Sequence, residues 1–110
     1  MNVVFLVGRL GQDPEIKYFE SGSVKARFSL AVDRTLSKAD KVTDWFQVEV
    51  WGKPAEIIAE YVKKGTALSV TGQLETQTWQ DQAGNTREAP VIRATEFRLE
   101  GSRRDAMSPA

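Results

Sequence analysis

The stretch DWFQVEVWGKPAEIIAEYVKKG, residues 44–65, predicts a β-strand that leads directly into an α-helix. In residues 44–53, Phe46, Val48 and Val50 alternate with other residues, as they do in a strand that buries one face. Two tryptophans of this strand fall on the opposite, polar face. The strand therefore has one face suited to a core, and a second face whose large aromatic rings need a separate explanation.

Pro54 marks the start of the only helix that the sequence predicts, because a proline in the first turn gives up an N–H that would have no partner there. The apolar residues of this helix form a stripe: Ile57, Ile58, Tyr61 and Val62. We expect the helix to end at Gly65. Lys63 and Lys64 would then lie at the negative end of the helix dipole, and complementing that dipole is their simplest role.

Apolar patterns predict further strands on both sides of this segment, over residues 3–10, 15–19, 24–33, 67–79 and 89–99. The first run is apolar enough to be buried on both faces. Gly72 predicts a bulge or sharp bend inside its strand, and Pro90 places the start of the last strand at a sheet edge. We expect a loop at 35–43 and a hairpin turn within 80–87.

With the short run 15–19 not counted as a separate strand, the order of these elements is three strands, one helix and two strands. It predicts an all-β protein with the OB-fold, a five-stranded Greek-key barrel with one helix between strands 3 and 4. We expect this domain to cover residues 1–100 and a flexible C-terminal tail to cover 101–110. Barrels of this type bind oligonucleotides or oligosaccharides on the face of strands 2 and 3 and on adjoining loops.

The composition argues against an enzyme. The chain has 110 residues without any histidine or cysteine, which removes the commonest general base, the usual zinc ligands and the thiol nucleophile. We therefore expect no catalytic residues, no metal and no cofactor. No apolar run is long enough for a membrane helix and no secretory signal is recognisable, so we expect a cytoplasmic protein without a membrane partner.

All three tryptophans of the chain, Trp45, Trp51 and Trp79, lie on the polar side of their predicted strands. Lys25 and Arg27 lie on the polar side of a neighbouring strand. Flat rings stack on unpaired bases and cations follow the phosphates, a combination that binds single-stranded nucleic acid without reading its sequence. The tryptophans could instead cover a subunit interface or close one end of the barrel.

Charge favours this binding less than the aromatic residues do. Fifteen Lys and Arg balance fifteen Asp and Glu, so the formal net charge is zero. Glu49 and Glu75 also share the polar side with the tryptophans. We expect modest affinity and a shallow dependence on salt.

Three segments resemble the bacterial-type single-stranded DNA-binding protein family, which has chloroplast and mitochondrial relatives: FLVGRLGQDPEIKY (5–18), the opening stretch, and VTGQLETQTWQDQAGNTR (70–87). The resemblance runs from residue 2 to 99. It implies an OB-fold that assembles as a homo-oligomer, usually a homotetramer. Such a protein coats single-stranded DNA during replication, recombination and repair, either in the bacterial cytoplasm or in an organelle.

The resemblance also implies roles for individual residues. The three tryptophans match base-stacking positions of the family, whereas Lys53 and the pair Lys63–Lys64 match positions that often contact the DNA backbone. With the cations of the neighbouring strand, loop and hairpin, the predicted nucleic-acid-binding residues are Trp45, Trp51, Trp79, Lys25, Arg27, Lys38, Lys41, Lys53, Lys63, Lys64 and Arg87.

The chain departs from the family pattern at several positions. Leu36 stands where many members have a further stacking aromatic, and Gln47, Gln77 and Thr78 stand at positions that are often basic. Residues 101–110 do not carry the acidic tip by which family members recruit partner enzymes; the sequence does not distinguish a naturally short form from one whose tail was removed, and we do not expect tail-mediated partners. Two other functions stay open: an OB-fold module that binds protein, and an RNA-binding OB domain. The sequence also does not distinguish a dimer from a tetramer.

Overall fold

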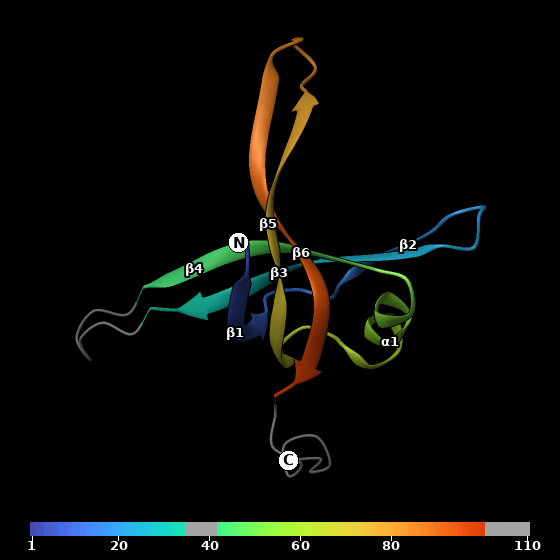
Figure 1. The fold of residues 1–110 in the computed structure, drawn as a ribbon, viewed down its shortest axis with the longest axis vertical. Coiled ribbons are helices and arrows are strands. Elements are labelled where there is room, and N and C mark those ends of the chain that lie inside the picture. The colour runs from blue at the N-terminus through green and yellow to red at the C-terminus, as the bar shows by residue number, and fades with distance from the viewer. Residues whose placement is uncertain (35–41, 101–110) are drawn as a thin grey trace.

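The computed structural model describes residues 1–34 and 42–100, and these form six strands and one helix. In chain order the elements are β1 (Val4–Leu10), β2 (Glu15–Tyr18), β3 (Val24–Asp33), β4 (Thr43–Trp51), α1 (Lys53–Tyr61), β5 (Ala67–Gln80) and β6 (Thr86–Leu99) (Figure 1). Within the described ranges, no helix combines the length and the apolar character needed to cross a bilayer.

The strands pair in the order β1-β5-β6-β4-β3-β2, and β1 also pairs with β3, which closes five of them into a ring. The closing contact is short, joining Arg9 to Ala31 and Leu10 to Leu30. Among the pairings of the described strands, only that of β4 with β6 is parallel. The predicted OB-fold is confirmed, although the helix lies between β4 and β5 because the short β2 is a strand of its own.

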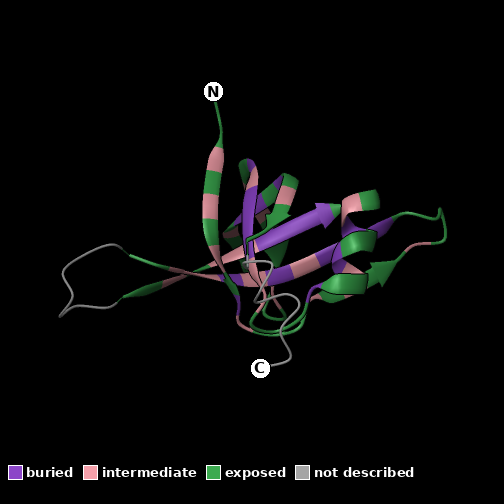
Figure 2. Ribbon diagram, turned by 90° about the horizontal axis from the view of Figure 1, so that it is seen from below, coloured by how far each residue is buried: buried purple, intermediate pink, exposed green. Residues whose placement is uncertain are grey.

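The core fills this ring. Figure 2 shows the buried residues gathered where the strands cross in the middle of the molecule, while the ends of the long strands are exposed. Val48 and Val50 of β4 are fully buried and Phe46 packs against the same cluster, so the predicted alternation of this strand is confirmed. The expectation that β1 is buried on both faces is wrong for the single chain, since Val3, Phe5 and Val7 are exposed.

Helix α1 lies against β3 and β4, and it is shorter than the sequence predicted. Val62 already has extended backbone angles, and it buries its side chain in the core while its N–H still donates to Ile58 O. The helix thus ends at Tyr61, before Gly65. Lys63 and Lys64 lie beyond the helix, and no basic residue lies in its last turn.

The predicted apolar stripe of this helix is only partly correct. Ala55, Ile58 and Val62 are buried, whereas Ile57 and Tyr61 are exposed. The buried residues are spaced by three and four positions, which places them on one narrow side of the helix. Only this side faces the strands.

The two longest strands, β5 and β6, form a hairpin that extends well beyond the ring (Figure 1). Strand β6 begins at Thr86, three residues before the predicted start at residue 89, and Pro90 pairs opposite Thr76 inside the arm. At this point β6 has no neighbour other than β5 among the described residues, since β4 pairs with it only from Ile92 to Ala94. A proline is tolerated there because that edge needs no N–H donor.

The predicted irregularity at Gly72 is confirmed, and it marks the place where the arm leaves the ring. Gly72 pairs with Ala94 while Thr71 pairs with Glu96, which leaves Thr95 as an extra residue in β6. A side chain at Gly72 would collide with the main chain at Arg93. The bulge increases the local twist and so allows the hairpin to turn away from the core.

Candidate nucleic-acid interface

The outward-facing residues of β3 and β4 form a ladder of side-chain pairs across the two strands. The register places Lys25 beside Trp51, Arg27 beside Glu49, Ser29 beside Gln47, and Ala31 beside Trp45. Trp45 and Trp51 therefore lie at the two ends of one row, with polar residues between them. We call this surface, together with the outward-facing residues of β2 and the β5–β6 arm, the outer face.

The polar middle of the outer face is a hydrogen-bonded network. Gln47 Nε2 donates to Ser29 Oγ at 2.7 Å, and Arg27 Nε donates to Gln47 Oε1 at 3.4 Å. Arg27 Nη1 also lies 3.8 Å from Glu49 Oε2. Glu49 is only 5% exposed, and its carboxylate accepts a further hydrogen bond from Gln77 Nε2. Because Arg27 has a carboxylate partner, its charge is partly offset at this surface.

The three tryptophans remain open to a ligand: Trp45, Trp51 and Trp79 are 58%, 37% and 49% exposed. The ring of Trp45 rests directly on Gly11, where any side chain would collide with the six-membered part of the indole. The ring is therefore supported from below by main chain, while its other side remains available for contact.

Trp51 is surrounded by groups that the sequence did not connect with it. The ring of Phe19 stacks on it, with the centroids 5.5 Å apart and the planes 18° from parallel. Lys25 Nζ lies 5.5 Å from the Trp51 centroid and Arg93 Cζ lies 6.0 Å from it, both within the range of cation–π attraction. Arg93 also approaches Glu75 at 3.9 Å.

Sequence reasoning missed Phe19 and Arg93. The alternation of 15–19 held a signal for the first of them, since Phe19 has the same parity as Lys17, and Lys17 pairs opposite Lys25. No comparable signal existed for Arg93. It reaches Trp51 because β6 runs parallel to β4, with Arg93 opposite Glu49.

Trp79 lies on the β5–β6 arm directly opposite Arg87. Arg87 Nε donates to Asp81 Oδ2 at 3.0 Å, and this hydrogen bond, followed by the bond from the Asn85 backbone, holds the pKa of Asp81 below its usual value. Asp81 also receives the N–H of Ala83 and thereby organises the turn at the tip. The arm thus presents a tryptophan and an arginine on a structured hairpin.

Near the start of β4, a bidentate ion pair joins Arg34 and Asp44, and Asp44 has the strand parity of the core-facing Phe46 and not that of Trp45. Arg34 Nε and Nη2 donate to the two carboxylate oxygens at 2.7 and 2.9 Å. The hydrogen bond from Arg34 lowers the pKa of Asp44, and the same bond raises the pKa of Arg34. The pair joins the chain at the end of β3 to the start of β4, on the opposite side of the strands from Trp45.

The other predicted lysines are not gathered around the tryptophans. Lys53 is exposed at the first position of α1. Lys63 lines a shallow pocket on the α1 side of the molecule, and the backbone N–H of Lys64 donates to Asp13 Oδ1. The predicted contacts at Lys38 and Lys41, and the substitution noted at Leu36, lie outside the described residues.

Nothing in residues 1–34 and 42–100 resembles a metal site, since these residues hold no cluster of three or more potential ligands. The arrangement instead offers three exposed indole rings, a hydrogen-bonded network that includes Arg27 and Glu49 between Trp45 and Trp51, and further cations beside Trp51 and Trp79. Such a surface can stack on flat rings and accompany an anionic chain.

Several known proteins are similar to this chain over most of its length. The model of the single-strand binding protein family matches residues 1–100. "Single-stranded DNA-binding protein 1" of Synechocystis is 51% identical over 106 residues, which cover 96% of this chain and 88% of the relative. A protein of the same name from Nostoc is 53% identical, with 96% of this chain and 87% of the relative covered. The "Single-stranded DNA-binding protein" of Thermosynechococcus vestitus is 51% identical, with 96% of this chain and 87% of the relative covered.

Proposed function

This chain belongs to the single-strand binding protein family, and from that premise we propose that it coats single-stranded DNA by stacking bases on the outer face. It acts as a binding protein and not as an enzyme. The role that follows is protection of strands exposed during replication, recombination and repair. A location in the bacterial cytoplasm is supported by the proposed DNA ligand and by the cyanobacterial relatives. Residues 1–100, which the family model matches, form the binding domain in this proposal.

The observation that carries the proposal is the exposure of three tryptophans on one continuous surface. Trp45 and Trp51 end the outer row of β4, and Trp79 extends the surface along the arm. Stacking on an indole needs only a flat base, so affinity would depend little on sequence. Duplex DNA keeps its bases stacked on each other and offers no such face, which accounts for selectivity toward single strands.

Cations of the outer face supply the contacts with phosphate in this proposal. Lys25, Arg27 and Arg87 lie beside Trp51, Glu49 and Trp79, respectively. Lys53, Lys63 and Lys64 extend the contact if the strand continues around α1, and Lys38 and Lys41 are proposed on sequence grounds alone. Because Arg27 and Arg87 also face carboxylates, each phosphate contact would release fewer counterions than in a fully basic site.

The exposed side of β1 supports assembly with further copies of the chain. Phe5 and Val7 of this strand are exposed, as is Val3 just before it. Within the described chain, Val4–Gly8 pairs only with β5, so the other edge of β1 is free there. An apolar strand with a free edge is a favourable surface for pairing with another chain. We propose a homo-oligomer, and a homotetramer in particular; mass measurement of the free protein tests this.

Titration with poly-dT tests the binding function. Strong quenching of tryptophan emission by poly-dT and weak quenching by duplex DNA of equal length are the expected results, because only unpaired bases can stack on the indoles. Equal quenching by both would contradict the proposal. Competition with an RNA oligomer of matched sequence shows whether a 2′-hydroxyl is tolerated, and preferred binding of the RNA would point to an RNA-binding protein.

A further inference from the structure

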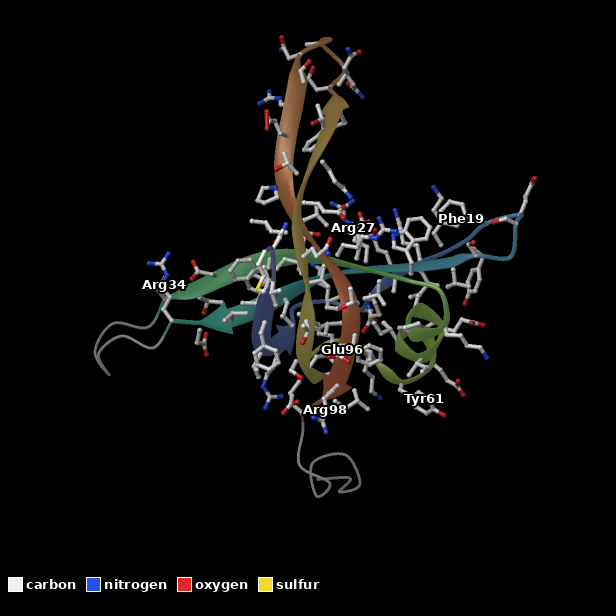
Figure 3. All side chains as sticks on the ribbon, viewed as in Figure 1. Phe19, Arg27, Arg34, Tyr61, Glu96 and Arg98 are labelled. Carbon is white, nitrogen blue, oxygen red and sulfur yellow. The ribbon has the colours of Figure 1, made fainter. Side chains whose placement is uncertain are left out.

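We infer that Phe19, with Lys17 and Lys25, forms a further nucleotide subsite on the β2–β3 hairpin, which takes one base and its phosphate next to Trp51. The inference rests on the proposed function and extends the path of the strand beyond the three tryptophans. Its first support is the position of Phe19. Figure 3 shows Phe19 and Arg27 on the side of β2 and β3 from which the β5–β6 arm projects, so Phe19 belongs to the outer face.

The second support is that Phe19 has no role in the core. It is half-buried, yet it belongs neither to the core cluster nor to the apolar residues packed against that cluster. Its one aromatic contact within the described residues is with Trp51, at 5.5 Å between centroids and 18° between planes. Rings stacked with an offset form a longer flat surface than one indole alone, and a base can lie on the part that the neighbouring ring leaves open.

The third support is the pair of lysines beside the two rings. Lys17 Nζ lies 5.2 Å from the Phe19 centroid, and Lys25 Nζ lies 5.5 Å from the Trp51 centroid. The two lysines are directly opposite each other in the β2–β3 ladder. Neither forms an ion pair with the described part of the chain, unlike Arg27 and Arg93, which face Glu49 and Glu75. These two ammonium groups are thus the cations of the outer face most available to a phosphate.

The backbone of the hairpin holds Phe19 in place before any ligand binds. The Phe19 N–H donates to Ser23 O, and the Gly22 N–H donates to Phe19 O, both at 2.9 Å. Gly22 has a φ of 92°, which a residue with a side chain rarely adopts. With its backbone fixed in this way and its ring stacked on Trp51, Phe19 loses little freedom when a base stacks on it, so the subsite is preorganised.

Two single variants of the full chain, Phe19→Leu and Tyr18→Leu, test the subsite. Tyr18 is a matched control because it is the adjacent aromatic residue, is 70% exposed and points to the opposite face of the hairpin. Affinity for a labelled dT35 oligomer is measured by anisotropy, which does not depend on tryptophan emission. We expect Phe19→Leu to weaken binding about fivefold or more and Tyr18→Leu to leave it within about twofold.

A direct contact is distinguished from an effect through Trp51 by photo-crosslinking of a 4-thiothymidine oligomer to the unmodified chain, followed by peptide mapping. A crosslink at Phe19 supports the subsite. Weakened binding by Phe19→Leu without any crosslink at Phe19 would mean that Phe19 only positions Trp51, and would overturn it. Lys17→Gln and Lys25→Gln should each reduce the slope of log affinity against log salt by about 0.7.

The outcomes separate the subsite from the broader function. If the unmodified chain binds dT35 and Phe19→Leu binds equally well, the subsite is wrong while the proposed function stands. If the unmodified chain does not bind dT35 at all, the proposed function fails, and the subsite fails with it.

Discussion

The carboxylate of Glu49 accepts a hydrogen bond from Gln77 Nε2 at 2.8 Å, although these residues lie on strands that are not neighbours in the sheet. Glu49 is in the ring, on β4, and Gln77 is in the arm, two residues before Trp79. The bond therefore ties the arm to the outer face and sets the position of Trp79 relative to the tryptophans of β4. It also places a buried negative charge in the middle of a surface proposed to bind a polyanion.

Glu49→Gln should strengthen binding to dT35 and steepen its salt dependence. The amide keeps an oxygen that can accept the hydrogen bond from Gln77, while the charge that faces Arg27 at 3.8 Å is removed. One additional free cation should increase the magnitude of the slope of log affinity against log salt by about 0.7. Glu60→Gln on the exposed side of α1 changes net charge equally and serves as the control. An equal change of slope in both variants would show that total charge, and not Glu49, is responsible.

Trp45→Ala and Trp79→Ala should each weaken binding to dT35 by about 1–3 kcal/mol, because each removes one stacking surface. Trp45→Phe and Trp79→Phe should retain most of the affinity, since a phenyl ring still offers a flat face. Anisotropy titrations measure the four affinities, and the mass of the free protein shows whether assembly is unchanged. An alanine variant that binds as tightly as the unmodified chain would exclude that tryptophan from the interface.

Ile58→Ala should destabilise the protein by about 2–5 kcal/mol, because it leaves a cavity at a fully buried position between α1 and the strands. Ile57→Ala, which differs by one position along α1, should change stability by no more than about 0.5 kcal/mol, since Ile57 is 44% exposed. Urea denaturation monitored by circular dichroism measures both. A large loss in the Ile57 variant would show that its side chain is covered in the assembled protein.

Asp81→Asn should remove an acid transition of the arm. In the folded protein the pKa of Asp81 is lowered, because Arg87 donates a hydrogen bond to its carboxylate. The ionised carboxylate therefore stabilises the arm at pH values above the pKa of an unfolded Asp, about 3.9. This stabilisation is lost as the pH falls through the lower pKa of the folded state. In a chain that carries Trp45→Phe and Trp51→Phe, the emission of Trp79 should change below about pH 4, and Asp81→Asn should abolish this change.

Asp44→Asn is the control for that titration. Asp44 also has a lowered pKa, owing to Arg34, but it lies at the far end of β4 and not in the arm. It should leave the acid transition of Trp79 in place. Loss of the transition in this variant as well would assign it to unfolding of the whole chain.

Much of the fold was predictable from local patterns. The alternation of Phe46, Val48 and Val50 identified both faces of β4, and the same reasoning placed all three tryptophans on exposed positions. Gly72 indicated the bulge, because a glycine inside a strand signals either a bend or the close approach of another backbone. These features depend only on residues that are near each other in the chain.

The end of the helix was harder to predict than its start. Pro54 acts through its own geometry, and the helix does begin beside it. Its end depends on Val62, which leaves helical geometry and reaches the core. The sequence showed an apolar residue at that position, but not that the strands lie where an extended backbone would bury it. The exposure of Ile57 and Tyr61 has the same cause.

The sequence by itself determined which residues share a face, because the period of a strand or a helix is a property of its own backbone. Only the tertiary structure decided which faces meet. Phe19 stacks on Trp51, and Gln77 reaches Glu49, because strands far apart in the chain pair in one particular register. That register is set jointly by the packing of the closed ring and by the bulge that turns the arm, and no local pattern contains it.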